Sequence, residues 1–415
     1  MRIATSTITQ IGVSGMNSQQ SQLVTLMEEI SSNRTVNLAG DDPASAAQSV
    51  QVQTKVQNNT QYTANQSSAT TSLGLEDSTL NSVATQIRSI QSILEKANNG
   101  SLTDSDRAAY ATQLQSAREQ LLSLANTTDA SGNYIFSGFQ TQTAPFTNAA
   151  SGPGVVYNGD QGVISAQVSS QRQIPTNDPG SNVFLSATPG AASPIATAPT
   201  TNGGSGTIGV LSTTQAGAAT NNDNFTVNFA VDAQGNTTYT VTDNTAVPAT
   251  TTQPASFTAG SAIQLGAGET ITINGAPANG DSFNVAPPTA AQNNIFTTID
   301  NAIAALQTPS QSASGQTNIA NAMATSLQQI GNSYTTVLTT LASVGSRETE
   351  LQTLGTLGTS IDTTYSTQLT NLVGLSTSDM AGVYSQLSTI QTQLSATQKA
   401  FVSTQQLSLF SQIQT

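Results

Sequence analysis

The longest regular pattern in the chain runs from Met323 to Leu372, MATSLQQIGNSYTTVLTTLASVGSRETELQTLGTLGTSIDTTYSTQLTNL. Apolar residues recur there at steps of three, four or seven, the spacing of a narrow apolar seam along one helix face. The seam comprises Met323, Leu327, Ile330, Tyr334, Val337, Leu341, Val344, Leu351, Leu354, Ile361, Tyr365 and Leu372. We therefore predict one helix, or two nearly collinear ones, with a length of roughly 75 Å.

A shorter seam of the same kind lies in the first third of the chain. Its members are Leu80, Val83, Ile87, Ile90 and Leu94. The run Asn98–Gly100 then favours a helix end, because glycine readily adopts the positive φ found just past a helix. Thr103 followed by Asp106 resembles a capping box, which predicts a further helix after Thr103.

Matching apolar seams mark the two ends of the chain. Ser376 and Asp379 form a possible capping box for a last helix. The helix faces away from the seams hold Ser, Thr, Gln and Asn, so the ion pairs that support isolated helices are scarce. We expect the first and last helices to pack together and to form an assembly interface that neighbouring copies complete. The predicted interface residues are Ile8, Met16, Leu23, Leu26, Ile30, Val383, Leu387, Ile390, Leu394, Phe401, Leu407, Leu409 and Phe410.

The pattern changes to strand in the middle of the chain, between about residues 148 and 286. Phe225–Val231 alternates apolar and polar residues, and Thr238–Val241 resumes the strand pattern after a turn that contains Gly235. Two alternating runs joined by a short glycine-containing turn predict a β-hairpin.

Two other parts of this middle region carry weaker signals. Ile271 and Ile273 precede the dipeptide Asn274–Gly275, which makes a second hairpin candidate. Ala187–Asn222 is rich in Ala, Thr, Pro and Gly and has few apolar anchors, so we expect a long loop or flexible insert there.

Composition narrows the chemistry available to this chain. It has no Cys and no His, so the usual thiolate nucleophile, general base and zinc ligands are missing, and we expect neither an enzyme nor a cofactor or metal site. Ten basic and 23 acidic residues give a net charge of −13, which repels nucleic acid. The start of the sequence lacks the features of a cleaved secretory signal, and no apolar run is long enough for membrane insertion.

Four segments resemble the family of flagellar hook-associated protein 3, a junction protein related to flagellin. They are Met1–Thr5, Asn37–Ala44, Gly132–Gly138 with Pro145–Phe146 behind it, and Leu407–Phe410. The third is the most specific, because it combines a tight turn after a helix with an expected aromatic strand. The start and the end of the chain depart from filament flagellin, which favours the junction protein. The motif residues are Asp41, Asp42, Pro43, Gly132, Asn133, Tyr134, Phe136 and Gly138.

The resemblance implies a mainly α fold with a β insert, in an elongated flagellin-like architecture whose long terminal helices pack as a coiled-coil bundle. The expected division is 1–45 with 376–415 as a terminal coiled-coil domain, 46–146 with 292–375 as a long-helix bundle, and 147–291 as a surface-exposed β-rich variable domain with a flexible insert near 187–222.

The resemblance also implies a structural role. A member of this family is exported without a cleaved signal peptide through the flagellar type III apparatus and is bound in the cytoplasm by a dedicated chaperone. It then polymerises outside the cell as a ring or tube between hook and filament. The implied partners are further copies of the chain, the neighbouring hook-associated junction protein, flagellin and the chaperone.

Other functions stay open at the level of sequence. The same helices would suit a filament flagellin or an intracellular coiled-coil scaffold, and the β insert could be an adhesin or glycan-binding module that uses Tyr157 or Tyr239. An enzyme would need two converging carboxylates, and a calcium ion could use the same groups, although no EF-hand loop is present. The candidate carboxylates are Asp223, Asp232, Asp243, Glu269 and Asp281.

Overall fold

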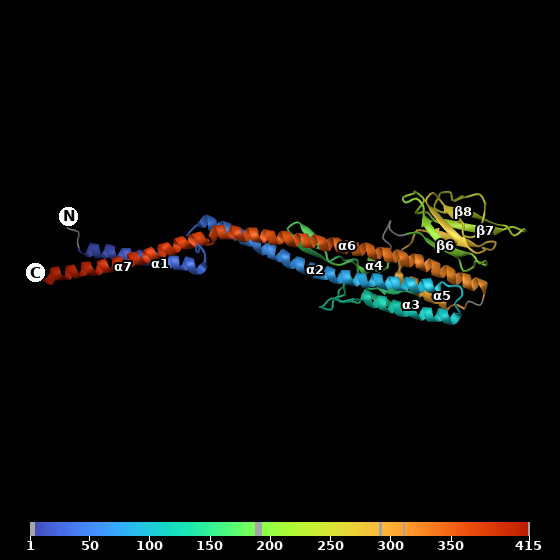
Figure 1. The fold of residues 1–415 in the computed structure, drawn as a ribbon, viewed down its shortest axis with the longest axis horizontal. Helices are drawn as coiled ribbons and strands as arrows, with labels where there is room; N and C mark the ends of the chain where they lie inside the picture. Colours follow the sequence, from blue (N-terminus) through green and yellow to red (C-terminus); the bar gives the residue numbers. More distant parts are fainter. Residues whose placement is uncertain (1–4, 187–192, 290–292, 310–311, 414–415) are drawn as a thin grey trace. The chain divides into compact units, whose positions relative to one another are not determined.

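The computed structural model describes residues 5–186, 193–289, 293–309 and 312–413 (Figure 1). The chain divides into two compact units, one formed by residues 1–65 and 353–415 and the other by residues 66–352. Two long helices, α2 and α6, contribute residues to both units. The helices are α1 Thr5–Ser32, α2 Pro43–Ala97, α3 Asp104–Ala125, α4 Gly180–Phe184, α5 Ile295–Gln307, α6 Ala313–Val373 and α7 Thr377–Ile413.

Helix α6 is one unbroken helix of 61 residues, which settles the choice between one helix and two. Every seventh residue of its predicted seam is buried within the 66–352 unit, with at most 2% of its surface exposed, whereas Leu327, Tyr334 and Leu341 between them are half-buried. The buried set is Met323, Ile330, Val337, Val344 and Leu351. The heptad spacing in the sequence therefore identifies the residues that face the core.

The predicted seam of α2 is also confirmed, because all five of its apolar residues from Leu80 to Leu94 are fully buried. Gln86 of α2 donates a 2.9 Å hydrogen bond to the carbonyl oxygen of Ala117 in α3, which lies alongside. The predicted capping box at the start of α3 is present, since the backbone N–H of Asp106 donates to Oγ1 of Thr103 at 3.2 Å.

An aromatic cluster fills the space between the helices and the short strands that follow α3. Phe136, Phe146, Phe184 and Phe296 are all buried, and the centroids of the Phe146 and Phe184 rings are 5.4 Å apart with near-perpendicular planes. Edge-to-face pairs of this kind add to the gain from burying apolar area. The cluster thus joins α4 and α5 to the strand that begins at Phe146.

The β insert consists of a six-stranded sheet in the order β10-β8-β7-β13-β5, with β9 also paired to β8, and a three-stranded sheet in the order β11-β12-β6. Two short hairpins, β1–β2 and β3–β4, lie outside these sheets. The strands are β1 Phe146–Asn148, β2 Val155–Tyr157, β3 Ser165–Ser169, β4 Arg172–Pro175, β5 Ile195–Thr197, β6 Thr207–Thr213, β7 Phe225–Val231, β8 Thr237–Asp243, β9 Thr250–Thr251, β10 Ala255–Ser256, β11 Ala262–Leu265, β12 Glu269–Asn274 and β13 Ser282–Ala286.

Residues from both larger sheets share one hydrophobic cluster, which includes Phe225, Val227 and Phe283 of one sheet and Ile271 and Ile273 of the other. These side chains occupy alternate positions along their strands, so each sheet has one face in the core and one face outward. The expected combination of long helices with a β insert is confirmed.

The insert is fastened to α6 by side-chain amides. Oδ1 of Asn321 accepts a 2.8 Å hydrogen bond from the backbone N–H of Ile208, and Oε1 of Gln328 accepts one of 2.7 Å from Ala196. Asn321 is 3% exposed, and its Nδ2 also donates to the carbonyl oxygen of Gly206. The polar positions of α6 therefore hold the first residues of β5 and β6 in place.

One hairpin predicted for the β insert is confirmed, and the second is correct in part. The predicted hairpin is present as β7–β8, with Val227 opposite Val241. The segment with Ile271 and Ile273 is a strand, but Asn274–Gly275 is not its hairpin turn. The turn lies at the other end, between β11 and β12, and Gly275, with φ 79°, instead directs the chain toward β13.

The long loop or flexible insert expected at residues 187–222 is wrong in part, because strands of three and seven residues lie within it. Residues 187–192 lie outside the described part of the chain, but β5 and β6 both fall within the expected loop. Ile195 and Ile208 supply the few apolar anchors, and both are buried. The hydrogen bonds to Asn321 and Gln328 support these strands, and such distant partners are not visible in a local composition.

Candidate assembly interface

Helices α1 and α7 lie side by side in the unit formed by residues 1–65 and 353–415 (Figure 1). Leu26, Leu375 and Val383 form a small buried cluster at one end of this pair. Partly buried side chains packed against the cluster are Ile30, Met380, Leu387 and Ile390. The structure thus brings together several of the residues predicted to pair, from opposite ends of the sequence.

Farther along the same pair, Gly12 of α1 faces Phe401 of α7. A Cβ atom on Gly12 would lie 3.1 Å from Cδ2 of Phe401, so glycine allows the ring to approach closely. Leu26 packs near Val383 and Gly12 near Phe401, so the two helices run antiparallel. Met16, Leu23 and Leu394 are half-buried along this seam. The side chains of Ile8, Leu407, Leu409 and Phe410 lie outside the described residues.

The pairing of α1 with α7 leaves large apolar side chains in solvent. Val24 is 57% exposed and Met27 47% exposed on α1, while Tyr384 is 52% exposed and Val402 54% exposed on α7. Such residues gain free energy only when another surface covers them. The helix pair therefore has apolar surface available beyond its own seam.

The end of α1 is joined to the link between α6 and α7 by backbone hydrogen bonds. The N–H of Thr35 donates to the carbonyl oxygen of Val373 at 3.0 Å, and the N–H of Leu375 donates to that of Asn33 at 3.1 Å. Asn33 has φ 54°, a left-handed conformation that ends α1. These bonds fix where α1 ends relative to the first turn of α7.

The predicted cap of α7 is present. The hydroxyl oxygen of Ser376 accepts a 3.2 Å hydrogen bond from the backbone N–H of Asp379, and Oδ2 of Asp379 accepts from the backbone N–H of Ser376 at 3.3 Å. This reciprocal arrangement satisfies backbone donors that the first turn of a helix leaves free.

The adjacent carboxylates Asp41 and Asp42 have different structural roles. Oδ1 of Asp42 accepts hydrogen bonds from the backbone N–H groups of Ala44 and Ser45 at 3.0 and 3.1 Å, so Asp42 caps α2, and Pro43 is the first residue of the helix. Hydrogen bonding to Ser45 lowers the pKa of Asp42. Oδ2 of Asp41 instead accepts from the backbone N–H of Leu38 at 2.8 Å and closes the preceding loop.

The segment Gly132–Gly138 forms consecutive turns, and the aromatic strand expected there is wrong. Tyr134 makes only an isolated bridge to Thr128, and the first strand begins at Phe146. Gly132 and Gly138 have φ of 84° and 71°, left-handed values that are incompatible with a continuous strand.

Within this segment, Asn133 is held by Asp129, whose Oδ1 accepts its backbone N–H at 2.8 Å, and Phe136 points into the aromatic cluster. The motif residues around Gly132–Gly138 therefore shape a turn and anchor it through one buried ring.

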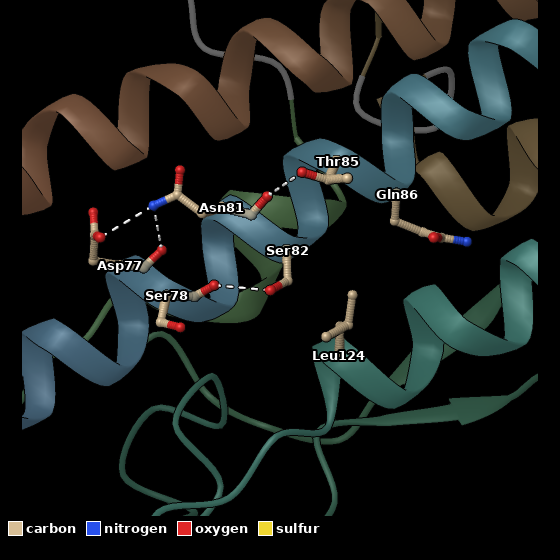
Figure 2. A pocket seen from close by; sticks show the side chains of 7 residues that line it. All are labelled: Asp77, Ser78, Asn81, Ser82, Thr85, Gln86 and Leu124. Atoms are coloured by element: carbon tan, nitrogen blue, oxygen red, sulfur yellow. Dashed lines mark hydrogen bonds between the residues drawn. The ribbon is translucent and has the colours of Figure 1, made fainter.

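A shallow groove of about 630 Å³ lies between α2 and the end of α3 (Figure 2). Several of its polar side chains bond to their own helix: Nδ2 of Asn81 donates to the carbonyl oxygen and to Oδ2 of Asp77, at 2.9 and 3.0 Å. Ser82 and Thr85 also donate to carbonyl oxygens one turn back. The groove is thus lined by Leu124 and by polar side chains most of which already make hydrogen bonds within the protein. Its lining contains no pair of converging carboxylates.

Three of the five carboxylates considered as catalytic or calcium-binding candidates stabilise turns. Oδ1 of Asp232 accepts backbone N–H groups of Gln234 and Asn236, and Asp243 does the same for Thr245 and Ala246. The buried Asp281 accepts from Gly203, Gly204 and Ala278. Glu269 and Asp223 are arranged differently and are considered below.

The aromatic residues considered for glycan binding are packed against the protein. Oη of Tyr157 lies 3.0 and 2.8 Å from the carbonyl oxygens of Phe136 and Asp160, and the ring of Tyr239 lies beside that of Phe229. Within the described ranges, no three or more His, Cys, Asp or Glu side chains gather to hold a metal ion. No helix in the described part of the chain has the length and hydropathy needed to cross a membrane.

Comparison with known proteins gives consistent matches. Residues 3–141 match the bacterial flagellin N-terminal helical region. Flagellar hook-associated protein 3 of Salmonella typhimurium is 38% identical over 191 residues, which cover 46% of this chain and 59% of that protein. The Escherichia coli protein of the same name is 28% identical over 411 residues, 99% of each chain. The crystal structure of the flagellar junction protein FlgL from Legionella pneumophila has a TM-score of 0.68 and 27% identity, over 79% of this chain and 100% of that one.

Proposed function

Because this chain belongs to the flagellar hook-associated protein 3 family, we propose that it is a structural subunit that joins the hook to the filament of a bacterial flagellum. The observation that carries this proposal is the match along 99% of the Escherichia coli hook-associated protein 3. The similarity to a solved flagellar junction protein over 79% of the chain supports the same role.

The assembly mechanism that we propose uses the paired terminal helices. Few side chains are fully buried between α1 and α7, and Val24, Met27, Tyr384 and Val402 remain in solvent. Burial of an apolar side chain from full exposure contributes about 1.5–3 kcal/mol, so covering the exposed half of each of these would contribute roughly half as much, and neighbouring copies in a ring or tube would provide that cover. The interface residues predicted from the sequence are the inner part of this surface.

The proposed partners follow from this role. They are further copies of the chain, the neighbouring hook-associated junction protein on one side and flagellin on the other, together with a cytoplasmic chaperone before export. The chain carries no disulfide, which would favour unfolding for passage through a narrow export channel to the extracellular flagellum.

Deletion of the gene in its source bacterium tests the proposal, with electron microscopy of the cells and detection of flagellin in the medium. We expect hooks without filaments and flagellin released into the medium, because filaments cannot attach. Cells that lack filaments and also release no flagellin would support the alternative role as the filament flagellin. Normal filaments would overturn both.

A further inference from the structure

Glu269, the first residue of β12, is a buried carboxylate that finds no hydrogen-bond partner among the described residues. It is 1% exposed, and within the described part of the chain neither Oε1 nor Oε2 has a hydrogen-bond partner. Its side chain points to the same side of β12 as Ile271 and Ile273, which belong to the core. A buried carboxylate is stable only when it is protonated, hydrogen-bonded or paired with a cation.

No basic side chain of the insert can supply that cation. The sequence contains no Lys or Arg between Arg172 and Arg347. Burial, and then the negative charge of Asp223, raise the pKa of Glu269 to about 7. Asp243 in turn acts on Asp223, whose pKa is raised by burial and by that neighbouring charge. The surroundings of Glu269 are therefore uniformly acidic.

The loop between β6 and β7 is hydrogen-bonded to the turn that precedes Glu269. The backbone N–H of Thr214 donates to the carbonyl oxygen of Gly268 at 2.8 Å, and that of Ala267 donates to Oγ1 of Thr220 at 2.8 Å. The loop also carries Asp223, which is near enough to Glu269 for its charge to raise the pKa of that carboxyl group.

The same loop adds a second unpartnered oxygen. Oδ1 of Asn221 is buried and accepts no hydrogen bond from the residues that the structure describes, although Nδ2 of the same amide donates to the carbonyl oxygen of Gln215 at 2.8 Å. A Cβ atom on Gly268 would lie 2.1 Å from Oδ1 of Asn221, so this oxygen lies directly against the residue before Glu269. Three unsatisfied oxygens, two on Glu269 and one on Asn221, thus occur on adjoining segments.

We propose that Glu269, Asp223 and the amide oxygen of Asn221 bind one calcium ion. Calcium is coordinated by carboxylate, amide and backbone carbonyl oxygens with flexible geometry, and water fills its remaining positions. Zinc is disfavoured because the site offers neither nitrogen nor sulfur, and magnesium demands a more regular octahedron. The site lies in the β insert, outside the terminal helices, and goes beyond the proposed junction role.

Calcium binding would have a defined structural effect. The ion would neutralise the repulsion between Glu269 and Asp223 and would tie the β6–β7 loop to the β11–β12 hairpin. Extracellular modules bind calcium with dissociation constants of about 10⁻⁴–10⁻³ M, which is the range expected for a site with two carboxylates. The insert would then be more stable outside the cell than before export.

Isothermal titration calorimetry of the full-length chain with calcium chloride tests the proposal, with magnesium chloride at equal ionic strength as the ion control. We expect one calcium equivalent with a dissociation constant of about 0.1–1 mM. Glu269→Gln should weaken binding at least tenfold, whereas Asp232→Asn, which removes one charge from an exposed turn of the same insert, should change it less than twofold. Absence of binding, equal binding of magnesium, or unchanged binding by Glu269→Gln would overturn the proposal.

Thermal unfolding of the same proteins provides a second measurement that does not depend on heats of binding. Calcium at 10 mM should raise the unfolding midpoint of the wild type by about 2–4 °C and that of Glu269→Gln by clearly less, because the weakened site is less occupied. If Glu269→Gln does not fold, Asp223→Asn replaces it, because Asp223 is only half-buried. A calcium shift as large in the folded variant as in the wild type would contradict the assignment.

Discussion

The backbone N–H of Asp178 donates a 3.0 Å hydrogen bond to Oε1 of Glu76, so that a buried carboxyl group of α2 meets the segment before α4. Glu76 is 1% exposed, and no described residue donates a hydrogen bond to its Oε2. The side chain of Asp178 is paired with Arg347, which also donates to the carbonyl oxygen of Pro175 at 3.2 Å. Burial, and then the charge of Asp178, raise the pKa of Glu76 to about 9 against the opposing effect of Arg347.

Glu76 should therefore make stability depend on pH. Its pKa is higher in the folded chain than its ordinary value of 4.5, so the folded state retains a proton that the unfolded chain loses as pH rises. The contribution is favourable below pH 4.5 and decreases as pH rises toward about 9. Glu76→Gln keeps the shape of the protonated group and should stabilise the chain at pH 8 by on the order of 1–3 kcal/mol.

Urea unfolding at pH 5 and pH 8 checks this prediction. The wild type should lose more stability between the two pH values than Glu76→Gln does. If the two proteins show parallel pH dependence, Glu76 does not hold the proton that its burial indicates.

The largely buried ion pair between α3 and α5 should contribute more to stability than the more exposed pair between β4 and α6. Nε of Arg118 lies 2.6 Å from Oδ1 of Asp300, and Oδ2 of Asp300 also accepts the backbone N–H of Gly154 at 2.6 Å. Arg118→Ala would leave the carboxylate of Asp300 poorly compensated and should destabilise the 66–352 unit by about 3–5 kcal/mol. Arg172→Ala removes the exposed pair with Glu350 and should cost less than about 1 kcal/mol.

Denaturant midpoints of Arg118→Ala and Arg172→Ala, measured side by side, check this comparison. Equal losses in the two variants would show that the Arg118 pair gains nothing from its buried position.

Two glycines of the same turn allow conformational strain to be separated from steric contact. Gly132 and Gly138 both have positive φ, but a Cβ atom on Gly132 meets nothing within 4 Å, whereas one on Gly138 would lie 2.1 Å from Oδ1 of Asp160. Gly132→Ala should therefore cost about 1–2 kcal/mol from backbone strain alone. Gly138→Ala should cost more, because the carboxylate that also accepts the N–H of Phe139 would have to move.

Thermal unfolding of Gly132→Ala and Gly138→Ala measures the difference. Losses of equal size would show that Asp160 can move aside without cost.

The helical part of the fold could be predicted in detail from the sequence. Steps of three and four residues identified the buried faces of α2 and α6, because a helix presents every seventh residue to nearly the same neighbour. The caps at Thr103 and Ser376 were equally readable, since the partner of each lies three residues away. Such patterns can be recognised in the sequence because they involve residues that are close together along the chain.

The features that could not be predicted depend on partners far apart in the sequence. Strands β5 and β6 lie in a segment of low complexity, and the amides of Asn321 and Gln328 that hold them are more than 100 residues away. Glu76 and Glu269 look like ordinary solvent-facing acids in the sequence, and only the tertiary structure shows that they are buried. The interface residues and the three-part division of the chain stay predictions.

The proposed assembly surface is tested most directly by Ile390→Asp, examined by motility and electron microscopy in cells that lack the native copy of the gene. Ile390 packs against the cluster of Leu26, Leu375 and Val383, so a charge there opposes the pairing of α1 with α7. We expect the variant to be secreted but to form no junction, so that cells carry hooks without filaments. Ser385→Asp, which adds the same charge at an exposed position of α7, should retain filaments. Normal filaments and motility with Ile390→Asp would contradict the account.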